Sequence, residues 1–448
     1  MSVLHNDWLG ALILLAMFAA TIAGAEIWTR FKHPDPELPR KFVHIVGGLG
    51  CLLFPFLVES PLMVAFMAGL LAAVFAVGQR SKGLQCLSGV GRKSRGSEYY
   101  PVAIAFLFFI SQGRWWLYFV SVLILTLADA AAALIGGRFG RLKYEVGESD
   151  TKSVEGSLVF LGVTFVVIAG LLRLLTNAET EMCLLVAFLV AVLLTGIEAI
   201  SVHGTDNVFV PIITCYVLLK ITTKPVAEVR FQCISMIVIF AVIGVVSIWM
   251  RLFSARDFII FFTFSYAAWS LGSADWGIPV FIGFGGFCLV WFLVRDRNQQ
   301  PIRTEVLLRI LMIPLGLLLV ANALNHYSVM FGPYLLAVLL PALMGAWVCL
   351  LRAKGSQLWR LLLLCIVGGL AFGLGASLSQ DDIGWREIIV LPIIGAAIVF
   401  VFDRWVRKSL DENYAVWSGP IWILTFVGVA VGYGLQYFRI ISAWNPRY

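Results

Sequence analysis

Charged side chains are scarce in this chain: they make up 13% of its 448 residues, whereas 60% of the residues are hydrophobic. The mean hydropathy is +0.92. Soluble globular domains carry about 25% charged residues, so this scarcity excludes an ordinary soluble domain. The apolar residues occur in runs close to the roughly 20 residues that span a bilayer, which predicts an all-α, polytopic integral membrane bundle with about 14 to 16 transmembrane segments.

Paired cysteines are also missing. The eight cysteines lie apart, mostly inside apolar runs, and no two of them form a CxxC pair. This spacing excludes a disulfide framework and a cysteine-based metal site. The short signatures of P-loops, dinucleotide-binding folds, zinc hydrolases and Ser/His/Asp hydrolases are absent too. The first apolar run, residues 8–25, follows no basic region and precedes no small-residue cleavage site, so we interpret it as a retained helix.

Basic residues gather in three short loops of the first half, at residues 30–41, 80–95 and 138–152. Counting the predicted spans places all three loops on one side of the membrane, and the positive-inside rule makes this the cytoplasmic side. The polar clusters of the first half then meet at one membrane face. A composition shift near residues 220–230 divides the chain, and the second half carries few polar residues within its spans.

An acidic residue, Asp129, stands near the end of one apolar run. Burying an ionised carboxylate in a membrane costs several kcal/mol unless a cation or a water-filled cavity receives it. On a helix, Asp129, Ala133, Gly136 and Gly140 share one face. The small residues there let a ligand's phosphates approach the backbone closely, or alternatively let two helices pack. Because hard cations on phosphates are held by one or two carboxylates, we predict that Asp129 binds Mg²⁺.

The sequence KSVEGS, residues 152–157, opens the next apolar run. Ser153 is predicted to cap the following helix, which directs free N–H groups and the positive helix end toward an anion. Lys152 adds a full charge for a polyphosphate. Glu155, in the first helical turn, is either a surface acid that stabilises the helix dipole or a base or second metal ligand.

A second basic cluster, Arg40, Lys41 and His44, begins another apolar run. Two cations and an imidazole one helical turn apart suit a phosphate or a lipid hydroxyl. The alternative is a positive-inside anchor with a buried histidine that is satisfied structurally.

Two further polar pairs are expected at the same face. Arg95 and Glu98 directly precede an apolar run, and Asp206 and Asn207 precede another. Asp206 supplies a second acid, and we expect it to share the metal with Asp129.

At these residues the chain resembles the polyprenol kinase family, which includes dolichol kinase, plant-type phytol kinase and the fungal CTP-dependent diacylglycerol kinase. The matching segments, in the family's order, are RKFVHIVGG, SRGSEYYPVAI, LADAAAALIGGRFG, KSVEGSLVF and EAISVHGTDNVFVP. The resemblance implies a CTP-dependent lipid kinase that uses Mg²⁺ or another divalent metal. Carried over by position, the family's nucleotide region falls on Asp129, Gly136, Gly140, Lys152, Ser153, Glu155 and Gly156, its Arg-Lys…His element on Arg40, Lys41 and His44, and its acid-Asn element on Asp206 and Asn207.

We therefore predict transfer of the γ-phosphoryl group of CTP to the hydroxyl of a lipid alcohol of the phytol, farnesol/geranylgeraniol or polyprenol class. The nucleotide would be held by Arg40, Lys41, Arg95 and the phosphate-binding residues above, and Glu155, Glu98 or His44 would accept the proton. We expect a kinase-like transmembrane domain over residues 1–225 and an additional transmembrane domain of unknown role over residues 226–448. The expected location is the bacterial cytoplasmic membrane, with the site facing the cytoplasm and no nucleic-acid partner.

Three alternatives stay open. The first is a related CTP-dependent enzyme, either a diacylglycerol kinase or a cytidylyltransferase that forms a CDP-lipid, although the signature D-x5-GHGG-x2-DR of CDP-diacylglycerol synthases is absent. The second is a transporter or flippase for an anionic lipid, which often has repeated halves that this chain lacks. The third is a degenerate kinase fold kept as a scaffold.

Overall fold

The computed structural model describes residues 6–80, 83–88, 95–111, 113–146, 151–294, 304–352, 368, 385–406 and 415–438. The chain forms two compact units, Met1–Met236 (unit 1) and Ile237–Tyr448 (unit 2). The division falls inside one long helix, a little beyond the composition shift at residues 220–230. The roles expected for the two parts stay predictions.

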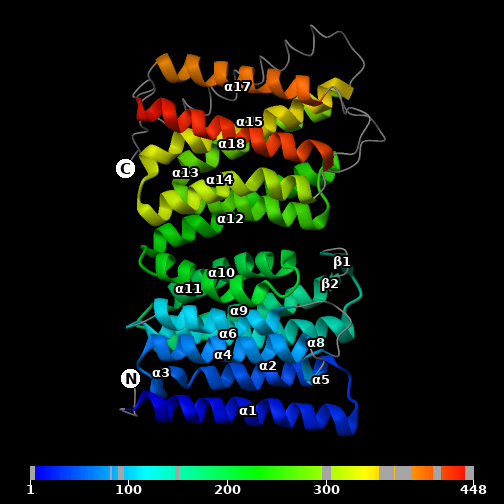
Figure 1. Ribbon diagram of the computed structural model, residues 1–448. Helices are drawn as coiled ribbons and strands as arrows, with labels where there is room; N and C mark the ends of the chain where they lie inside the picture. The colour runs from blue at the N-terminus through cyan, green and yellow to red at the C-terminus, as the bar shows by residue number, and fades with distance from the viewer. Residues whose placement is uncertain are drawn as a thin grey trace. The chain divides into compact units, whose positions relative to one another are not determined.

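Unit 1 consists of helices stacked side by side (Figure 1). They are α1 (Asp7–Lys32), α2 (Glu37–Cys51), α3 (Phe54–Leu57), α4 (Pro61–Arg80), α5 (Gln85–Ser88), α6 (Gly96–Ile110), α7 (Trp115–Leu123), the π-helical turn η1 (Ile124–Ala128), α8 (Asp129–Phe139), α9 (Val154–Leu175), α10 (Thr180–Ile200), α11 (Asp206–Ile221) and the start of α12 (Val226–Met250). A short antiparallel hairpin of β1 (Lys143–Glu145) and β2 (Thr151–Ser153) connects α8 to α9, with Tyr144 paired to Lys152. The sequence had predicted a basic loop at this position.

Unit 2 holds the remainder of α12 and the helices α13 (Ala255–Val294), α14 (Thr304–Leu324), α15 (Tyr327–Arg352), α17 (Trp385–Val406) and α18 (Ala415–Tyr437). Aromatic side chains fill part of its core, where the Tyr334 hydroxyl donates to the Trp276 carbonyl oxygen over 2.9 Å. The long helix α13 is kinked at Ser273, which has a φ of 70°.

Ten helices within the described residues are long and apolar enough to cross a membrane, and α6 is a shorter apolar helix. Many of their large apolar side chains remain exposed, as expected where the surrounding solvent is lipid rather than water. The chain is therefore an integral multi-pass membrane protein, and the predicted all-α class is confirmed. The expected number of about 14 to 16 segments concerns the whole chain, of which the structure describes a part.

One membrane span, Trp115–Phe139, is not a uniform α-helix. The π-helical turn η1 interrupts it directly before Asp129. Single π-turns inside α-helices frequently mark functional sites. Here α2 packs against the turn at Gly48, where an added Cβ would lie 2.1 Å from the Thr126 hydroxyl oxygen. Only glycine permits this approach, which positions the α2 side chains next to Asp129.

Candidate functional site

A cleft in unit 1 brings together four of the polar residues that the sequence singles out: Asp129, Lys152, Ser153 and Asp206. It encloses about 1050 Å³, counting the part open to its surroundings. We call it the charged cleft. Its lining residues are Glu37, Asp129, Ala132, Ala133, Gly136, Gly137, Lys143, Thr151, Lys152, Ser153, Gly156, Ser157, Glu198 and Asp206. Several elements therefore converge at this cleft, as the basic-loop pattern predicts. They are the start of α2, the helix α8, the hairpin, the start of α9, the end of α10 and the start of α11.

Asp129 lies at the α2 side of the charged cleft and meets two groups from α2. The Lys41 ammonium donates to Asp129 Oδ2 over 2.5 Å and contacts the Asp129 carbonyl oxygen at 3.3 Å. His44 Nε2 lies 3.3 Å from the same carboxylate oxygen and 2.9 Å from the Leu125 carbonyl oxygen. Since Lys41 is only 2% exposed, its charge is neutralised chiefly by Asp129. The predicted Arg-Lys…His element and the predicted metal ligand are thus in direct contact.

Lys152 also lines the charged cleft and lies close to two acids. Its ammonium donates to Glu198 Oε1 over 2.6 Å and to the Glu198 carbonyl oxygen, and it lies 3.9 Å from Asp206 Oδ2. Burial alone would lower the pKa of Lys152, but the carboxylates of Glu198 and Asp206 outweigh it and raise the pKa above its ordinary value. Lys152 therefore carries a full positive charge at neutral pH.

Two buried oxygens have no hydrogen-bond partner among the described residues, one on the acid that contacts Lys152 and one on the neighbour of Asp206 in the chain. They are Glu198 Oε2 and Asn207 Oδ1. The Asn207 amide is oriented by its nitrogen, which donates to the Gly204 carbonyl oxygen over 3.2 Å and to Asp206 Oδ1 over 3.4 Å. Buried polar atoms are nearly always paired, so these two oxygens indicate positions where a ligand group, an ion or water belongs.

Ser153 caps α9 as predicted: its hydroxyl accepts a hydrogen bond from the Gly156 N–H over 3.2 Å. Its side chain also fills the space beside two predicted glycines, Gly136 in α8 and Gly140 directly after that helix. A Cβ added to Gly136 would lie 2.8 Å from Ser153 Oγ, and one added to Gly140 would lie 2.5 Å from it. The small residues therefore pack α8 against the start of α9. Gly136 and Gly156 also line the charged cleft, whereas Gly140 does not.

Glu155 points away from the charged cleft. Its carboxylate accepts hydrogen bonds from the Arg141 and Leu142 N–H groups at 3.0 Å and 3.2 Å, which ties the hairpin to the first turn of α9. Of the two roles open from the sequence, this geometry favours the structural one.

Lys41, His44 and Asn207 are not part of the cleft lining, although Lys41 and His44 contact Asp129, and three further predicted residues, Arg40, Arg95 and Glu98, also lie outside it. Arg40 pairs with Glu37, with its Nε 2.9 Å from Glu37 Oε2, and lines a neighbouring apolar chamber. Arg95 lies at the start of α6, where its backbone N–H donates to the His203 carbonyl oxygen over 3.0 Å. Glu98 follows in the same turn and is also absent from the lining.

The charged cleft offers a donor set that suits a phosphate-bound Mg²⁺ ion. Among the described residues no three His, Cys, Asp or Glu side chains are grouped to hold a metal by themselves. Mg²⁺ on phosphates needs only one or two carboxylates, with waters and phosphate oxygens completing the octahedron. Asp129 and Asp206 line the cleft and keep 18% and 17% of their side chains exposed. Hard, partly exposed carboxylates beside cations fit such an ion.

Two acids of the charged cleft were not singled out from the sequence. Glu198 is the more informative, because a carboxylate in the last turn of an apolar helix is the same signal that drew attention to Asp129. Glu37 opens α2 and pairs with Arg40. An acid in the first turn of a helix is common, so its position carried little information.

The fold and the cleft define a class: a multi-pass helical membrane protein with a lysine-and-carboxylate site where several helix ends meet. Comparison with known proteins narrows this class. The chain is 33% identical over 208 residues to the phytol kinase of Synechocystis sp., an alignment that covers 46% of this chain and 88% of that protein. No protein-family model and no solved structure matches. The chain belongs to the polyprenol/phytol kinase family, with an additional C-terminal region.

Proposed function

We propose that this protein is a lipid-alcohol kinase that transfers the γ-phosphoryl group of CTP to the hydroxyl of an isoprenoid alcohol. The observation that carries the proposal is the charged cleft, in which Lys152 and the capped start of α9 face Asp129 and Asp206. Family membership supports the same chemistry, since the relative is named a phytol kinase. The choice of CTP rests on the family resemblance.

Phosphoryl transfer requires positioning and charge stabilisation more than covalent chemistry from the protein. We assign the triphosphate to Lys152 and the N-terminal end of α9, where N–H groups and the helix dipole favour an anion. Asp129 and Asp206 would hold Mg²⁺, which supplies charge neutralisation at the phosphates when bound. Lys41 keeps Asp129 ionised and oriented.

The acceptor hydroxyl needs a group that takes up its proton. Of the three candidates from the sequence, His44 has the most suitable position, because its ring contacts Asp129. Its Nε2 lies 3.3 Å from Asp129 Oδ2 and 2.9 Å from the Leu125 carbonyl oxygen and therefore carries the N–H, which leaves Nδ1 to take up the proton. None of the three lines the charged cleft, but His44 contacts Asp129, which does, whereas Glu155 is held by the Arg141 and Leu142 N–H groups. We therefore assign the proton to His44. By the positive-inside argument, this site faces the cytoplasm of a bacterial inner membrane.

The test is a reaction panel with purified full-length protein and Mg²⁺. Phytol, farnesol, geranylgeraniol, undecaprenol and diacylglycerol are each combined with CTP, ATP, GTP and UTP, and both products are analysed. We expect an isoprenoid phosphate and CDP. Asp129→Asn should abolish turnover while the protein still purifies as a folded species, because the amide oxygen can still accept a hydrogen bond from Lys41, and EDTA should abolish turnover reversibly.

Each alternative has its own signature in this panel. Pyrophosphate release together with a CDP-lipid would establish a cytidylyltransferase. Phosphorylation of diacylglycerol alone would establish a diacylglycerol kinase. No product from any pair, combined with lipid flux in liposomes without nucleotide, would replace the kinase proposal with a flippase.

A further inference from the structure

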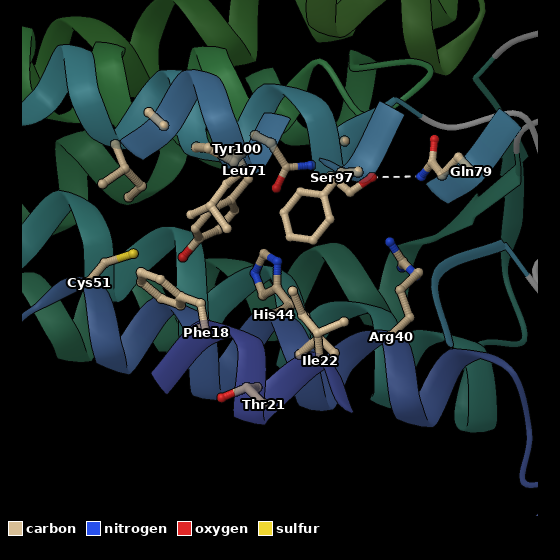
Figure 2. Close-up of a pocket in the computed structure, with 18 of the residues that line it drawn as sticks. Phe18, Thr21, Ile22, Arg40, His44, Cys51, Leu71, Gln79, Ser97 and Tyr100 are labelled. Atoms are coloured by element: carbon tan, nitrogen blue, oxygen red, sulfur yellow. Dashed lines mark hydrogen bonds between the residues drawn. The ribbon is translucent and has the colours of Figure 1, made fainter. Parts of the chain in front are cut away.

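We propose that an apolar chamber beside the charged cleft holds the hydrocarbon tail of the acceptor alcohol and that the aromatic end of the chamber limits the length of the tail. This inference rests on the proposed function and specifies its acceptor. The chamber lies between two packed helix pairs, α1 with α2 and α4 with α6 (Figure 2). It encloses about 1100 Å³, counting the part open to its surroundings. Its lining is mostly apolar, which suits a hydrocarbon tail.

The chamber and the charged cleft meet at His44. The imidazole lines the chamber, as Figure 2 shows, while its Nε2 lies 3.3 Å from Asp129 Oδ2 in the cleft. The Tyr100 ring packs edge-on against His44, with centroids 5.0 Å apart, and closes the chamber wall there. A molecule with its tail in the chamber thus ends beside the group that contacts the predicted metal ligand.

The polar end of the chamber also presents an unused hydrogen-bond acceptor. Asn207 lines the chamber and is 8% exposed, and its Oδ1 has no partner among the described residues. Because the amide nitrogen already donates to two oxygens, Oδ1 is left as the free end of this side chain. An alcohol O–H is a donor that satisfies it, whereas a carboxylate or phosphate head group would bring only further acceptors. Asn207 therefore suits the hydroxyl head of the acceptor alcohol.

Two aromatic side chains line the chamber beside Cys51, at the end away from Arg40. Phe18 and Phe54 stack with ring centroids 6.1 Å apart, and both are buried. On α2 the lining extends from Arg40 to Cys51, which is about 16 Å along the helix, or half of a bilayer core of about 30 Å. A tail of diterpenoid length can end against these two rings. A polyprenol of many isoprene units would have to leave the chamber sideways.

A glycine on the α2 wall provides a direct test. A Cβ added to Gly47 meets nothing within 4 Å, so Gly47→Leu fills chamber space one turn beyond His44 without a backbone clash. The matched control is Gly69→Leu on α4, where an added Cβ also meets nothing and the residue is exposed away from the chamber. Leucine has a higher helix propensity than glycine, so neither change weakens its helix.

The measurement is kcat/KM for geraniol, farnesol and geranylgeraniol with the full-length variants. We expect Gly47→Leu to lower the preference for geranylgeraniol over geraniol at least tenfold, with an unchanged affinity for Mg²⁺-nucleotide, and Gly69→Leu to match the wild type. An unchanged chain-length preference in a folded Gly47→Leu protein would overturn the inference while leaving the kinase proposal intact.

A second measurement needs no variant. The wild-type protein is irradiated with an isoprenoid alcohol carrying a diazirine at the tail end, and the adducts are mapped by mass spectrometry. We expect adducts on Phe18, Phe54 or their chamber neighbours, competed by unlabelled geranylgeraniol. Adducts confined to other helices would refute the chamber. If the wild type phosphorylates no alcohol with any nucleotide, the proposed function fails, and the adduct map alone then decides whether the chamber binds a tail.

Discussion

The ammonium group of Lys41 on α2 lies 2.5 Å from Oδ2 of Asp129, the residue that directly follows the π-helical turn η1. The two residues are 88 positions apart in the chain, and their contact joins the α2 cluster to the predicted metal ligand. Lys41 thus provides the counter-charge that an ionised acid in an apolar span requires.

Removing one member of this pair should cost more than removing both. Lys41→Met leaves the Asp129 carboxylate buried without its main partner, and such breaks typically destabilise a protein by about 3–5 kcal/mol. Thermal unfolding in detergent should therefore show a clearly lower midpoint for Lys41→Met. The double variant Lys41→Met/Asp129→Leu should regain most of the lost stability and stay inactive. If the double variant unfolds as early as the single one, the pair is not the source of the loss.

Neutralising Lys152 should weaken nucleotide binding. Lys152→Met removes the cation that we assign to the phosphates and leaves Glu198 and Asp206 as two acids without their shared cation. We expect kcat/KM for nucleotide to fall about 100-fold, or about 2.7 kcal/mol. Lys220→Met, at an exposed position on α11, is the control and should be nearly unaffected. Equal activities of the two variants would remove Lys152 from the phosphate site.

The raised pKa of Lys152 predicts how the stability of the protein and its nucleotide affinity depend on pH. A lysine whose folded-state pKa exceeds its unfolded value of about 10.4 stabilises the fold below that value and loses this contribution only as pH rises through the folded pKa. Nucleotide affinity should consequently show no titration from Lys152 between about pH 6 and 9. Binding isotherms across that range will reveal any such step, and a loss of affinity below pH 9 that Lys152→Met abolishes would contradict the assignment.

Glu155→Gln should retain most of the activity. The side chain holds the hairpin through hydrogen bonds to the Arg141 and Leu142 N–H groups, and the amide oxygen of glutamine can still accept one of them. We expect less than a tenfold fall in kcat, whereas removal of a general base typically costs about 10²–10⁴-fold. Glu155→Leu, whose side chain accepts no hydrogen bond, should have the lower kcat of the two variants. A fall beyond a hundredfold in Glu155→Gln would return this residue to the list of proton acceptors.

The packing of α8 against α9 depends on Gly156. An added Cβ would lie 3.0 Å from the Ala132 carbonyl oxygen and 3.3 Å from the Gly136 Cα, so Gly156→Ala must push the two helices apart. Overpacking of this kind costs about 1–3 kcal/mol. Gly162→Ala on the same helix has open space around its Cβ and should be neutral or stabilising. The unfolding midpoints of the two variants, measured side by side, test this difference. Equal midpoints would show that α8 can shift away from the added Cβ without a loss of stability.

Much of the candidate site could be predicted because polar residues in an apolar chain are conspicuous. Asp129, Lys152 and Asp206 each stand where an apolar run begins or ends, and the positions of the basic loops place those ends at one membrane face. Ser153 was identified as a cap from its residue type and position alone. The all-α class followed from the length of the apolar runs.

Other features of the site depend on contacts between distant segments, which a single sequence does not encode visibly. The pairing of Lys41 with Asp129 requires the close approach at Gly48. The outward direction of Glu155 requires the hairpin, whose strands are only three residues each. Glu198 could have been predicted from the same signal as Asp129, because it is a carboxylate in the last turn of an apolar helix, α10.

The π-helical turn from Ile124 to Ala128 has a consequence for the spacing of this segment. Each residue of an α-helix advances the chain by about 100° around the axis, so deleting one residue from the turn would swing Asp129 away from Lys41 and His44 by roughly that angle. The number of residues between Trp115 and Asp129 thus determines the direction of the Asp129 side chain, whatever the identities of those residues. A single deletion there should abolish turnover while circular dichroism still reports the same helix content, and an active deletion variant would show that the angular phase of this segment is not constrained.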